Sequence, residues 1–380
     1  MTTKIKIAAI RFIQILLWWV PIRNNRIMFY ANNRKGYVCN PAALMKALQS
    51  QRPDQYELIW VTRFPETCRK RPGITVVKQR SLTYFKLFLR TKFFITNDMV
   101  DEALVKKNGQ IFLTTWHGGG AYKKVGSSAL KEDDGFAKNF HKWYSRLDYF
   151  VSSCQVCTDL YAGAFGLDRR IFLETGTPRN DIFFHEHPEI ARRVRDFYKL
   201  EPDIRILLFA PSFQMSAPEK EIYDTGVLAD MAAKLRDTTG ESWCILYRCH
   251  YFRENDVIAS TDLVKNGNAY YEIQELLYAS DVLVTDFSSC IWDFALTGRP
   301  IVVLEPRLKE YERQDRGFFV SYEKWPYIKC QSLSELPDII QQYGSRDFSE
   351  EYAAHFEEMG SFEQGKACQD IINLIEQQKE

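Results

Sequence analysis

Short apolar runs alternate with amphipathic stretches along most of the chain. The runs are rich in β-branched and aromatic residues, and the stretches between them carry apolar residues at helical spacing. The predicted strands span residues 26–30, 57–62, 92–96, 111–115, 149–152 and 171–175, followed by 205–210, 243–247 and 282–285. Because strands and helices alternate, we expect an α/β fold of parallel sheets with crossover helices.

Residues 184–200 interrupt this alternation. The segment, FHEHPEIARRVRDFYKL, is polar and helical in character without an obvious core stripe, so we interpret it as the connection between two domains. The length of 380 residues is about twice that of a usual domain, which favours two lobes. The predicted organisation is a segment 1–22, a Rossmann-like lobe 23–190 and a Rossmann-like lobe 191–380, each with its ligand site beyond the carboxyl ends of its strands.

The N-terminal segment has a different pattern, KIKIAAIRFIQILLWWVPIR. On a helix, one face would be apolar (Ile5, Ala9, Phe12, Leu16 and Trp19) and another polar (Lys4, Arg11 and Gln14). Charges interrupt it too early for a bilayer span of about 20 apolar residues. Its paired tryptophans and flanking arginines suit a membrane–water interface, so we predict an amphipathic membrane-association segment. A core or oligomer-packing helix is the alternative.

Composition excludes some classes of function. The net charge of +1 provides no global basic field, so we predict no nucleic-acid partner. The nine cysteines and the lack of a visible secretory signal suggest reduced thiols in a cytosolic compartment, with the lone CxxC of Cys154 and Cys157 structural rather than metal-binding. No carboxylate cluster has clear metal spacing. We therefore predict no metal and no cofactor.

The stretch TWHGGGAYKK is the first candidate for chemistry. His117 follows the predicted strand 111–115, so it lies at a carboxyl end, where an open α/β lobe places its site. The glycines from Gly118 onward permit close approach of a ligand or of the other lobe, and Lys123 and Lys124 add positive charge. An oxyanion loop of an α/β-hydrolase would need a GxSxG elbow, which the chain lacks. A structural His-Gly turn remains the alternative.

A second histidine, His250, follows the predicted strand 243–247 in YRCHYF. Arg248 lies two residues earlier, so both side chains share a face if the backbone is extended, and the pair suits a phosphate. We interpret the remaining histidines, which lie in polar segments, as solvated: His141, His185, His187 and His355.

The strongest helix-start signal is VTDFSSCIWDFALTGRP, residues 284–300. Asp286, Ser288 and Ser289 follow a strand and supply capping groups, and Asp293 lies one turn further on. Free N–H groups at such a start bind phosphate, although an ordinary N-cap is the alternative. Three weaker pieces also follow strands or lie in loops: GTPRND with Arg179, APSF with Pro211 and Ser212, and the predicted loop 311–319 with Arg313 and Arg316.

These motifs, in this order, resemble those of the CDP-glycerol glycerophosphotransferases that build teichoic acids and related capsules. The resemblance covers roughly residues 26–345 and rests on TWHGGGAYKK, GTPRND, APSF, RCH, TDFSSCIWD and RGFF. It implies a GT-B fold of two Rossmann-like lobes facing a cleft. It also implies that an acceptor hydroxyl attacks the phosphorus bearing the glycerol, that CMP leaves, and that the acceptor is a lipid-linked glycan at the cytoplasmic face of the cell membrane.

The resemblance also implies roles for the candidate residues. His117 would be the general base, and His250 with Arg248 would bind the donor phosphates or stabilise the leaving CMP. The serine pair would cradle the pyrophosphate with Asp293 in support. The remaining donor-binding candidates are Gly118, Arg179, Pro211, Ser212 and Asp286. The resemblance further implies that lobe 23–190 binds the acceptor and lobe 191–380 binds the CDP-linked donor.

Two departures from the family pattern leave the acceptor and the polyol open. Gly119-Gly120 stand where the family has Thr-Pro, and Gln214 stands where it has Arg. The alternatives are a CDP-ribitol phosphotransferase, a sugar-transferring GT-B enzyme and a catalytically silent nucleotide-binding scaffold. The motifs do not distinguish a single transfer from polymerisation, nor do they indicate the oligomeric state.

Overall fold

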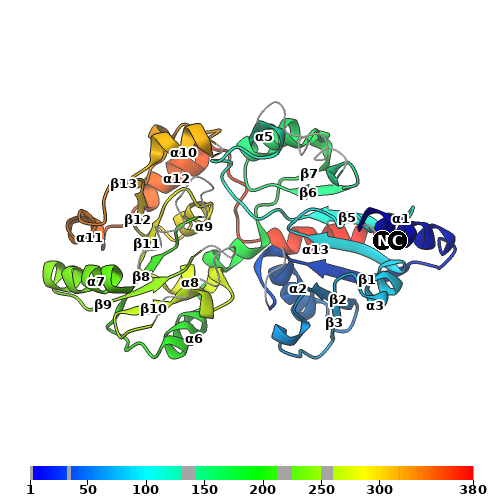
Figure 1. Cartoon of the computed structure of the whole chain (residues 1–380), viewed down its shortest axis with the longest axis horizontal. Coiled ribbons are helices and arrows are strands. Elements are labelled where there is room, and N and C mark those ends of the chain that lie inside the picture. Colours follow the sequence, from blue (N-terminus) through cyan, green and yellow to red (C-terminus); the bar gives the residue numbers. More distant parts are fainter. Residues whose placement is uncertain are drawn as a thin grey trace. The chain divides into compact units, whose positions relative to one another are not determined.

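The computed structural model describes residues 3–31, 36–129, 143–212, 225–249, 260–315 and 317–379. It divides into two compact units (Figure 1). The N-terminal unit comprises Met1–His117, Gly126–Asp181 and Phe362–Glu380, and the C-terminal unit comprises Gly118–Val125 and Ile182–Ser361. We call Gly118–Val125 the glycine arm, because it belongs to the C-terminal unit although the chain on both sides of it belongs to the other.

The N-terminal unit is built on a seven-stranded sheet of order β3-β2-β1-β4-β5-β6-β7 in which every pair of neighbours is parallel. Its strands are β1 Arg23–Tyr30, β2 Glu57–Thr62, β3 Ile74–Lys78, β4 Thr91–Thr96, β5 Ile111–Thr114, β6 Tyr149–Val151 and β7 Phe172–Leu173. Its α-helices are α1 Thr3–Leu16, α2 Cys39–Gln51, α3 Leu82–Phe88, α5 Gln155–Phe165 and α13 Ala367–Gln377. Ser81 caps α3 as predicted, since its hydroxyl accepts the Tyr84 N–H at 3.1 Å.

The last helix of the chain returns to this unit. Ile371, Ile372 and Ile375 of α13 are buried in the same core cluster as the apolar residues of α2, and the two helices are labelled side by side in Figure 1. The carboxylate of Asp181 accepts the N–H groups of Ala367 at 3.0 Å and Cys368 at 2.8 Å, which satisfies donors at the start of α13. The observed division therefore differs from the predicted lobe 191–380, because the chain from Phe362 onward belongs to the first unit.

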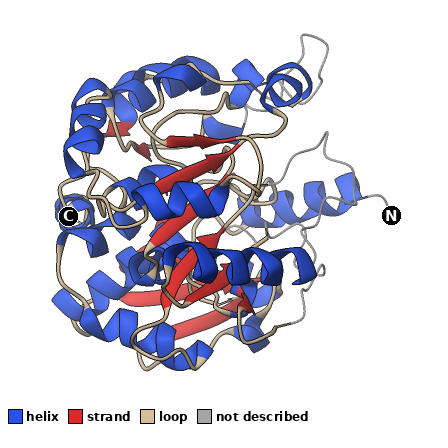
Figure 2. Cartoon of the chain, turned by 90° about the vertical axis from the view of Figure 1, so that its left-hand side faces the viewer, coloured by secondary structure: helices blue, strands red, loops and turns tan. Residues whose placement is uncertain are grey.

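The C-terminal unit has a six-stranded parallel sheet of order β10-β9-β8-β11-β12-β13, with helices in front of and behind the strands (Figure 2). Its strands are β8 Arg205–Phe209, β9 Trp243–Tyr247, β10 Val264–Asn266, β11 Val282–Thr285, β12 Ile301–Leu304 and β13 Ile328–Cys330. Its α-helices are α6 Pro188–Tyr198, α7 Thr225–Thr239, α8 Ile273–Ala279, α9 Cys290–Ala295, α10 Leu308–Gln314, α11 Leu336–Tyr343 and α12 Ser349–Glu358.

Both sheets follow the strand order of Rossmann-type folds, which confirms the predicted α/β class with two parallel sheets. In each sheet the order reverses at one point, between β1 and β4 in the first and between β8 and β11 in the second. Ligands of such sheets bind at that point, beyond the carboxyl ends of the strands. Four strands are absent from the prediction: β3, β10, β12 and β13.

Two local interpretations are wrong. The segment 184–200 does have a core stripe, because Ile190, Val194 and Tyr198 of α6 are buried at a spacing of four residues, and α6 packs on α8. The stripe is narrow and is flanked by charged residues, so the sequence pattern did not reveal it. The predicted loop 311–319 begins as helix, since α10 continues to Gln314.

Helix α1 lies with its apolar residues outward. Phe12 and Leu16 are 61% and 60% exposed, whereas Gln14 is buried, and Trp19 in the turn after the helix is 78% exposed. The Gln14 amide donates to the carbonyl of Ala103 at 2.7 Å and accepts the Val105 N–H at 3.2 Å. A polar side chain thus attaches this helix to its unit. Within the residues that the structure describes, no helix is long and apolar enough to cross a membrane.

Candidate functional site

His117 comes three residues after β5 and is half-buried. Its Nδ1 lies 2.8 Å from the carbonyl oxygen of Asn97, which follows the neighbouring strand β4. A carbonyl oxygen only accepts, so Nδ1 carries the proton and, in the neutral ring, Nε2 carries the lone pair. This tautomer is the one that a general base requires.

The backbone before His117 is held by Asn40 of α2. The Asn40 amide nitrogen donates to the carbonyls of Thr115 and Trp116, each at 3.1 Å, and its amide oxygen accepts the Arg179 N–H at 3.0 Å. Asn40 is fully buried. One side chain therefore joins the end of the β5 segment to the GTPRND turn. The sequence analysis did not select Asn40 or Asn97. Asn97 comes directly after a strand, so the criterion that selected His117, a polar residue at the carboxyl end of a strand, could have found it.

Trp116 has a left-handed backbone, with φ of +51°, which is uncommon for a bulky residue and costs about 1–3 kcal/mol. Its ring centroid lies 4.3 Å from that of His117. Asp98, directly after Asn97, has a carboxyl group whose pKa is raised by burial. Strained backbone next to His117 and a perturbed carboxyl next in sequence to its partner Asn97 are features typical of functional sites.

Arg179 belongs to the N-terminal unit rather than to the unit predicted to bind the donor. Its guanidinium Nη1 lies 3.2 Å from the Cys39 sulfur, and the side chain is buried. Beside it, Glu363 accepts from the Thr177 hydroxyl at 2.7 Å and from the Asn180 amide at 3.1 Å. These contacts hold the GTPRND turn in place, and donor contact by Arg179 stays a prediction.

In the C-terminal unit, two predicted residues meet where the strand order reverses. Ser212 follows β8, and its N–H donates to the Asp286 carboxylate, after β11, at 2.8 Å. Pro211, half-buried, precedes Ser212. Within the described ranges, the buried Ser212 hydroxyl oxygen has no hydrogen-bond partner. A hydroxyl in that position is suited to a polar ligand.

Ser288 and Ser289 are half-buried before α9, which has only six residues. The Ser288 oxygen lies 3.4 Å from the Cys290 N–H, a weak cap, and Ser289 makes no capping bond through its side chain. The predicted N-cap role is therefore slight for both serines. Asp293 is buried one turn further on.

Arg248 is engaged with its own unit. Its guanidinium donates to the backbone carbonyls of Gly267 at 2.8 Å, Tyr270 at 2.5 Å and Tyr271 at 3.0 Å. These bonds shape the loop after β10, so direct phosphate binding by Arg248 has no support in them. His250 and Arg316 lie outside the described residues.

The model of the family described as CDP-Glycerol:Poly(glycerophosphate) glycerophosphotransferase matches residues 12–377. The chain belongs to this family. It is 29% identical to a teichoic acid glycerol-phosphate transferase of Staphylococcus aureus (strain NCTC 8325 / PS 47), over 92% of each chain. A teichoic acid poly(glycerol phosphate) polymerase of Bacillus subtilis (strain 168) is 25% identical over 94% of this chain and 49% of its own length.

A solved structure of the wall teichoic acid polymerase TagF matches with a TM-score of 0.86 at 24% identity, over 97% of this chain and 93% of that one. This likeness shows the fold. As a member of the glycerophosphotransferase family, the chain is a phosphotransferase of the teichoic acid polyol-phosphate transferase and polymerase group. The chain spans nearly the whole of the S. aureus relative but about half of the B. subtilis polymerase.

The remaining candidates of this family member lie in the C-terminal unit. Lys123 and Lys124 are half-buried in the glycine arm, which also contains the half-buried Gly118. Lys123 forms an antiparallel bridge with Phe318, and the Lys124 N–H donates to Gly317 at 3.2 Å, so the lysine pair lies against the RGFF motif. Arg313 is exposed on α10, and its Nε donates to the Lys309 carbonyl at 3.1 Å.

His355 corrects a further interpretation. It was expected to be solvated but is 5% exposed, and its Nε2 lies 2.8 Å from the Tyr122 hydroxyl. Burial lowers the pKa of His355. His185 is exposed and His187 half-buried, while His141 lies outside the described residues.

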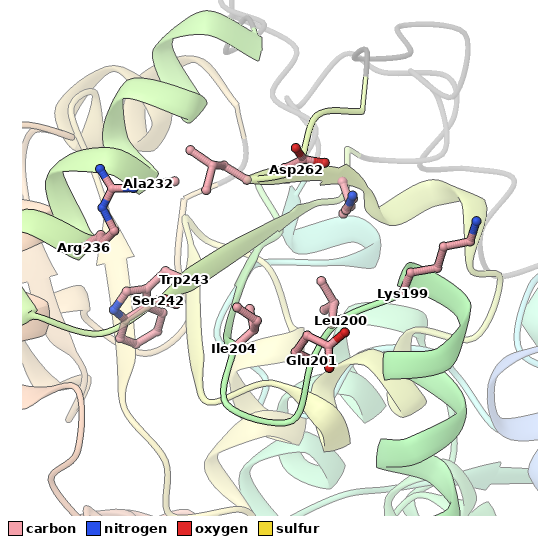
Figure 3. Close-up of a pocket in the computed structure, with 11 residues that line it drawn as sticks. Lys199, Leu200, Glu201, Ile204, Ala232, Arg236, Ser242, Trp243 and Asp262 are labelled. Atoms are coloured by element: carbon pink, nitrogen blue, oxygen red, sulfur yellow. The ribbon is translucent and has the colours of Figure 1, made fainter.

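A cavity of about 270 Å³ opens elsewhere in the C-terminal unit (Figure 3). Its lining includes Glu201, Ser242 and Trp243, at or before the starts of β8 and β9. It therefore lies at the amino ends of the strands, and none of the predicted site residues lines it. In the described part of the chain, no group of three or more His, Cys, Asp or Glu side chains could hold a metal ion.

Proposed function

We propose that the chain transfers glycerol phosphate from CDP-glycerol to a hydroxyl group of a lipid-linked glycan acceptor, releasing CMP. The observation that carries the proposal is the hydrogen bond from His117 Nδ1 to the Asn97 carbonyl, in a member of the glycerophosphotransferase family. It leaves Nε2 as the basic nitrogen, and an imidazole has a pKa near neutral pH without perturbation.

In the proposed reaction, His117 Nε2 takes the proton of the acceptor hydroxyl. The acceptor oxygen then forms a bond to the phosphorus that bears the glycerol. The bond between that phosphorus and the oxygen of the CMP phosphate breaks, and CMP leaves with the electron pair. Such transfer relies mainly on positioning and on stabilising the developing charge.

The donor site is proposed at the strand reversal of the C-terminal unit. The buried Ser212 hydroxyl and the serine pair 288–289 offer donors to phosphate oxygens, and Asp286 holds the Ser212 backbone. By the family resemblance, His250 stabilises the leaving CMP. Since the Arg248 guanidinium donates to three carbonyls of the loop after β10, its proposed part is to shape this site rather than to bind phosphate.

The proposed location is the cytoplasmic face of the cell membrane, with peripheral attachment through α1. Support comes from the exposed apolar side chains Phe12 and Leu16 of α1 and Trp19 just after it, on a segment attached to its unit through Gln14. Exposed apolar residues gathered on one helix suit insertion at the lipid headgroup level. Replacing Phe12 and Trp19 with serine should lower co-sedimentation with phosphatidylglycerol vesicles at least tenfold. Leu82→Ser is the matched control, because Leu82 is 80% exposed but lies on α3.

Ribitol phosphate is the second candidate for the transferred group. A teichoic acid poly(ribitol-phosphate) polymerase of Bacillus spizizenii (strain ATCC 23059 / NRRL B-14472 / W23) is also 25% identical, over 94% of this chain and 57% of its own length. Purified chain is incubated with CDP-glycerol or CDP-ribitol and a lipid-linked acceptor, and CMP release is measured. We expect release from CDP-glycerol. Release from CDP-ribitol alone would overturn that choice, and nucleotide binding without release from either donor would favour a silent scaffold.

A further inference from the structure

The glycine arm is bound to the C-terminal unit by backbone pairing. The Phe319 N–H donates to the Tyr122 carbonyl at 2.8 Å, and the Lys124 N–H donates to the Gly317 carbonyl at 3.2 Å. Between these bonds lies the antiparallel bridge of Lys123 with Phe318. The arm therefore acts as a short added strand beside the RGFF motif, although the next residue before it, His117, belongs to the N-terminal unit.

Tyr122 anchors the arm by its side chain. It is 3% exposed, and its hydroxyl lies 2.7 Å from that of Tyr327 and 2.8 Å from His355 Nε2. A tyrosine hydroxyl both donates and accepts, so Tyr122 can donate to one of these partners and accept from the other. The Tyr122 ring also lies 4.7 Å from that of Trp325 and stacks on His355.

The glycines of the arm lie against Trp292 of α9. A Cβ atom on Gly119 would be 2.2 Å from Trp292 Cδ1, and one on Gly120 would be 2.6 Å from Trp292 Cε3. Gly120 has φ of +76° and Ala121 has φ of +46°, so the turn is also conformationally demanding. Trp292 is fully buried and adjoins Asp293, on the helix that follows Ser288 and Ser289.

We infer that Tyr122 is a positioning residue for the base: through the glycine arm it fixes the backbone that directly follows His117. The inference rests on the proposed function. Gly118, the first residue of the arm, directly follows His117, and the arm pairs with Gly317 and Phe319 and packs on Trp292 of the C-terminal unit. A buried hydroxyl with two partners limits the displacement of that arm, and a displacement of about 1 Å can cost 10²-fold in rate.

Tyr122→Phe tests this inference, since it removes the hydroxyl and keeps the ring. We expect kcat for CMP release to fall about tenfold, with the KM for the CDP-linked donor and the Kd for CDP unchanged. Amide hydrogen exchange across 118–125 should quicken in the same variant. Tyr352→Phe is the matched control: Tyr352 is equally buried in the same unit, but its hydroxyl accepts the Ile301 N–H at 3.3 Å, and its removal should leave kcat unchanged.

A double-mutant cycle provides a second test that does not involve the hydroxyl. Gly119→Ala should lower kcat more than tenfold, because its methyl group collides with Trp292. In a Trp292→Leu background, the same Ala substitution should cost less than threefold, since the obstructing ring is gone. Equal losses in both backgrounds would contradict the packing on which the inference depends.

The outcomes separate this inference from the proposed function. If the wild type releases CMP and Tyr122→Phe matches it in kcat, the positioning role is wrong and the proposed function stands. A rise in KM or in the Kd for CDP at unchanged kcat would assign Tyr122 to donor binding and also overturn the inference. If the wild type releases CMP from neither donor, the proposed function fails, and the positioning role fails with it.

Discussion

The two units share a strand order but use the carboxyl ends of their strands differently. In the N-terminal unit, main-chain carbonyls and amides surround one imidazole: Asn97 orients the His117 ring, and Asn40 holds the backbone before it. In the C-terminal unit, hydroxyl groups and a carboxylate line the strand reversal, with the buried Ser212 oxygen lacking a partner among the described residues. The same architecture therefore holds an imidazole by main-chain contacts in one unit and presents hydroxyl groups beside a carboxylate in the other.

The largest expected effect comes from His117→Ala. Removing a positioned general base lowers rate by 10²–10⁴-fold, so we expect CMP release to fall about 10³-fold while the Kd for CDP stays within twofold. Steady-state assays and calorimetric titration with CDP measure the two quantities. The exposed His185, replaced by alanine, is the control and should behave as wild type. If His117→Ala kept full turnover, His117 would not be the general base, and the proposed difference in role between the two units would be wrong.

Asn40→Ala should have the second largest effect on catalytic rate. It leaves two carbonyls and the Arg179 N–H without their buried partner, which we expect to cost about 3 kcal/mol in the free energy of unfolding. Urea unfolding monitors this loss, and kcat should fall more than tenfold because the backbone that carries His117 loosens. A loss of stability with unchanged kcat would show that Asn40 supports the fold without positioning the base.

In the C-terminal unit, Ser212→Ala should weaken ligand binding without lowering stability. Because the Ser212 hydroxyl makes no hydrogen bond to the described residues, its removal should leave the free energy of unfolding unchanged within about 0.5 kcal/mol. The Kd for CDP should rise about tenfold, as expected for one lost hydrogen bond to a charged ligand. Ser280→Ala is the control, since its buried hydroxyl donates to the Leu276 carbonyl at 2.7 Å. That variant should lose stability and retain the Kd.

The smallest expected effect is a pH dependence of stability through His355. Its pKa is lowered in the folded state by burial, so the unfolded chain binds more protons below about pH 6.5. The contribution of the neutral ring to stability is therefore present above that pH and is lost as the pH falls below it, by at most ~1.4 kcal/mol per pH unit. Urea unfolding of wild type and His355→Gln between pH 7.5 and 5.5 compares the slopes. Identical slopes would contradict this origin.

The local pattern of the chain predicted its parallel strands and the edge at which its chemistry should lie. Apolar runs such as 57–62 and 243–247 are buried on both sides, so they are visible without knowledge of their neighbours. Residues directly after such runs, including His117, Ser212 and Asp286, could be assigned to carboxyl ends for the same reason. Short strands such as Val264–Asn266 were missed, because so few residues carry too little periodicity.

Other features of the protein depend on contacts between residues far apart in the chain, and only the tertiary structure decided them. The proton on His117 Nδ1 follows from a carbonyl 20 positions earlier, and the return of α13 follows from apolar contacts with α2 across most of the sequence. The glycines after His117 are explained by Trp292, which no local pattern could connect to them. Sequence periodicity reports which side of an element is buried, whereas only the folded chain determines what lies against it.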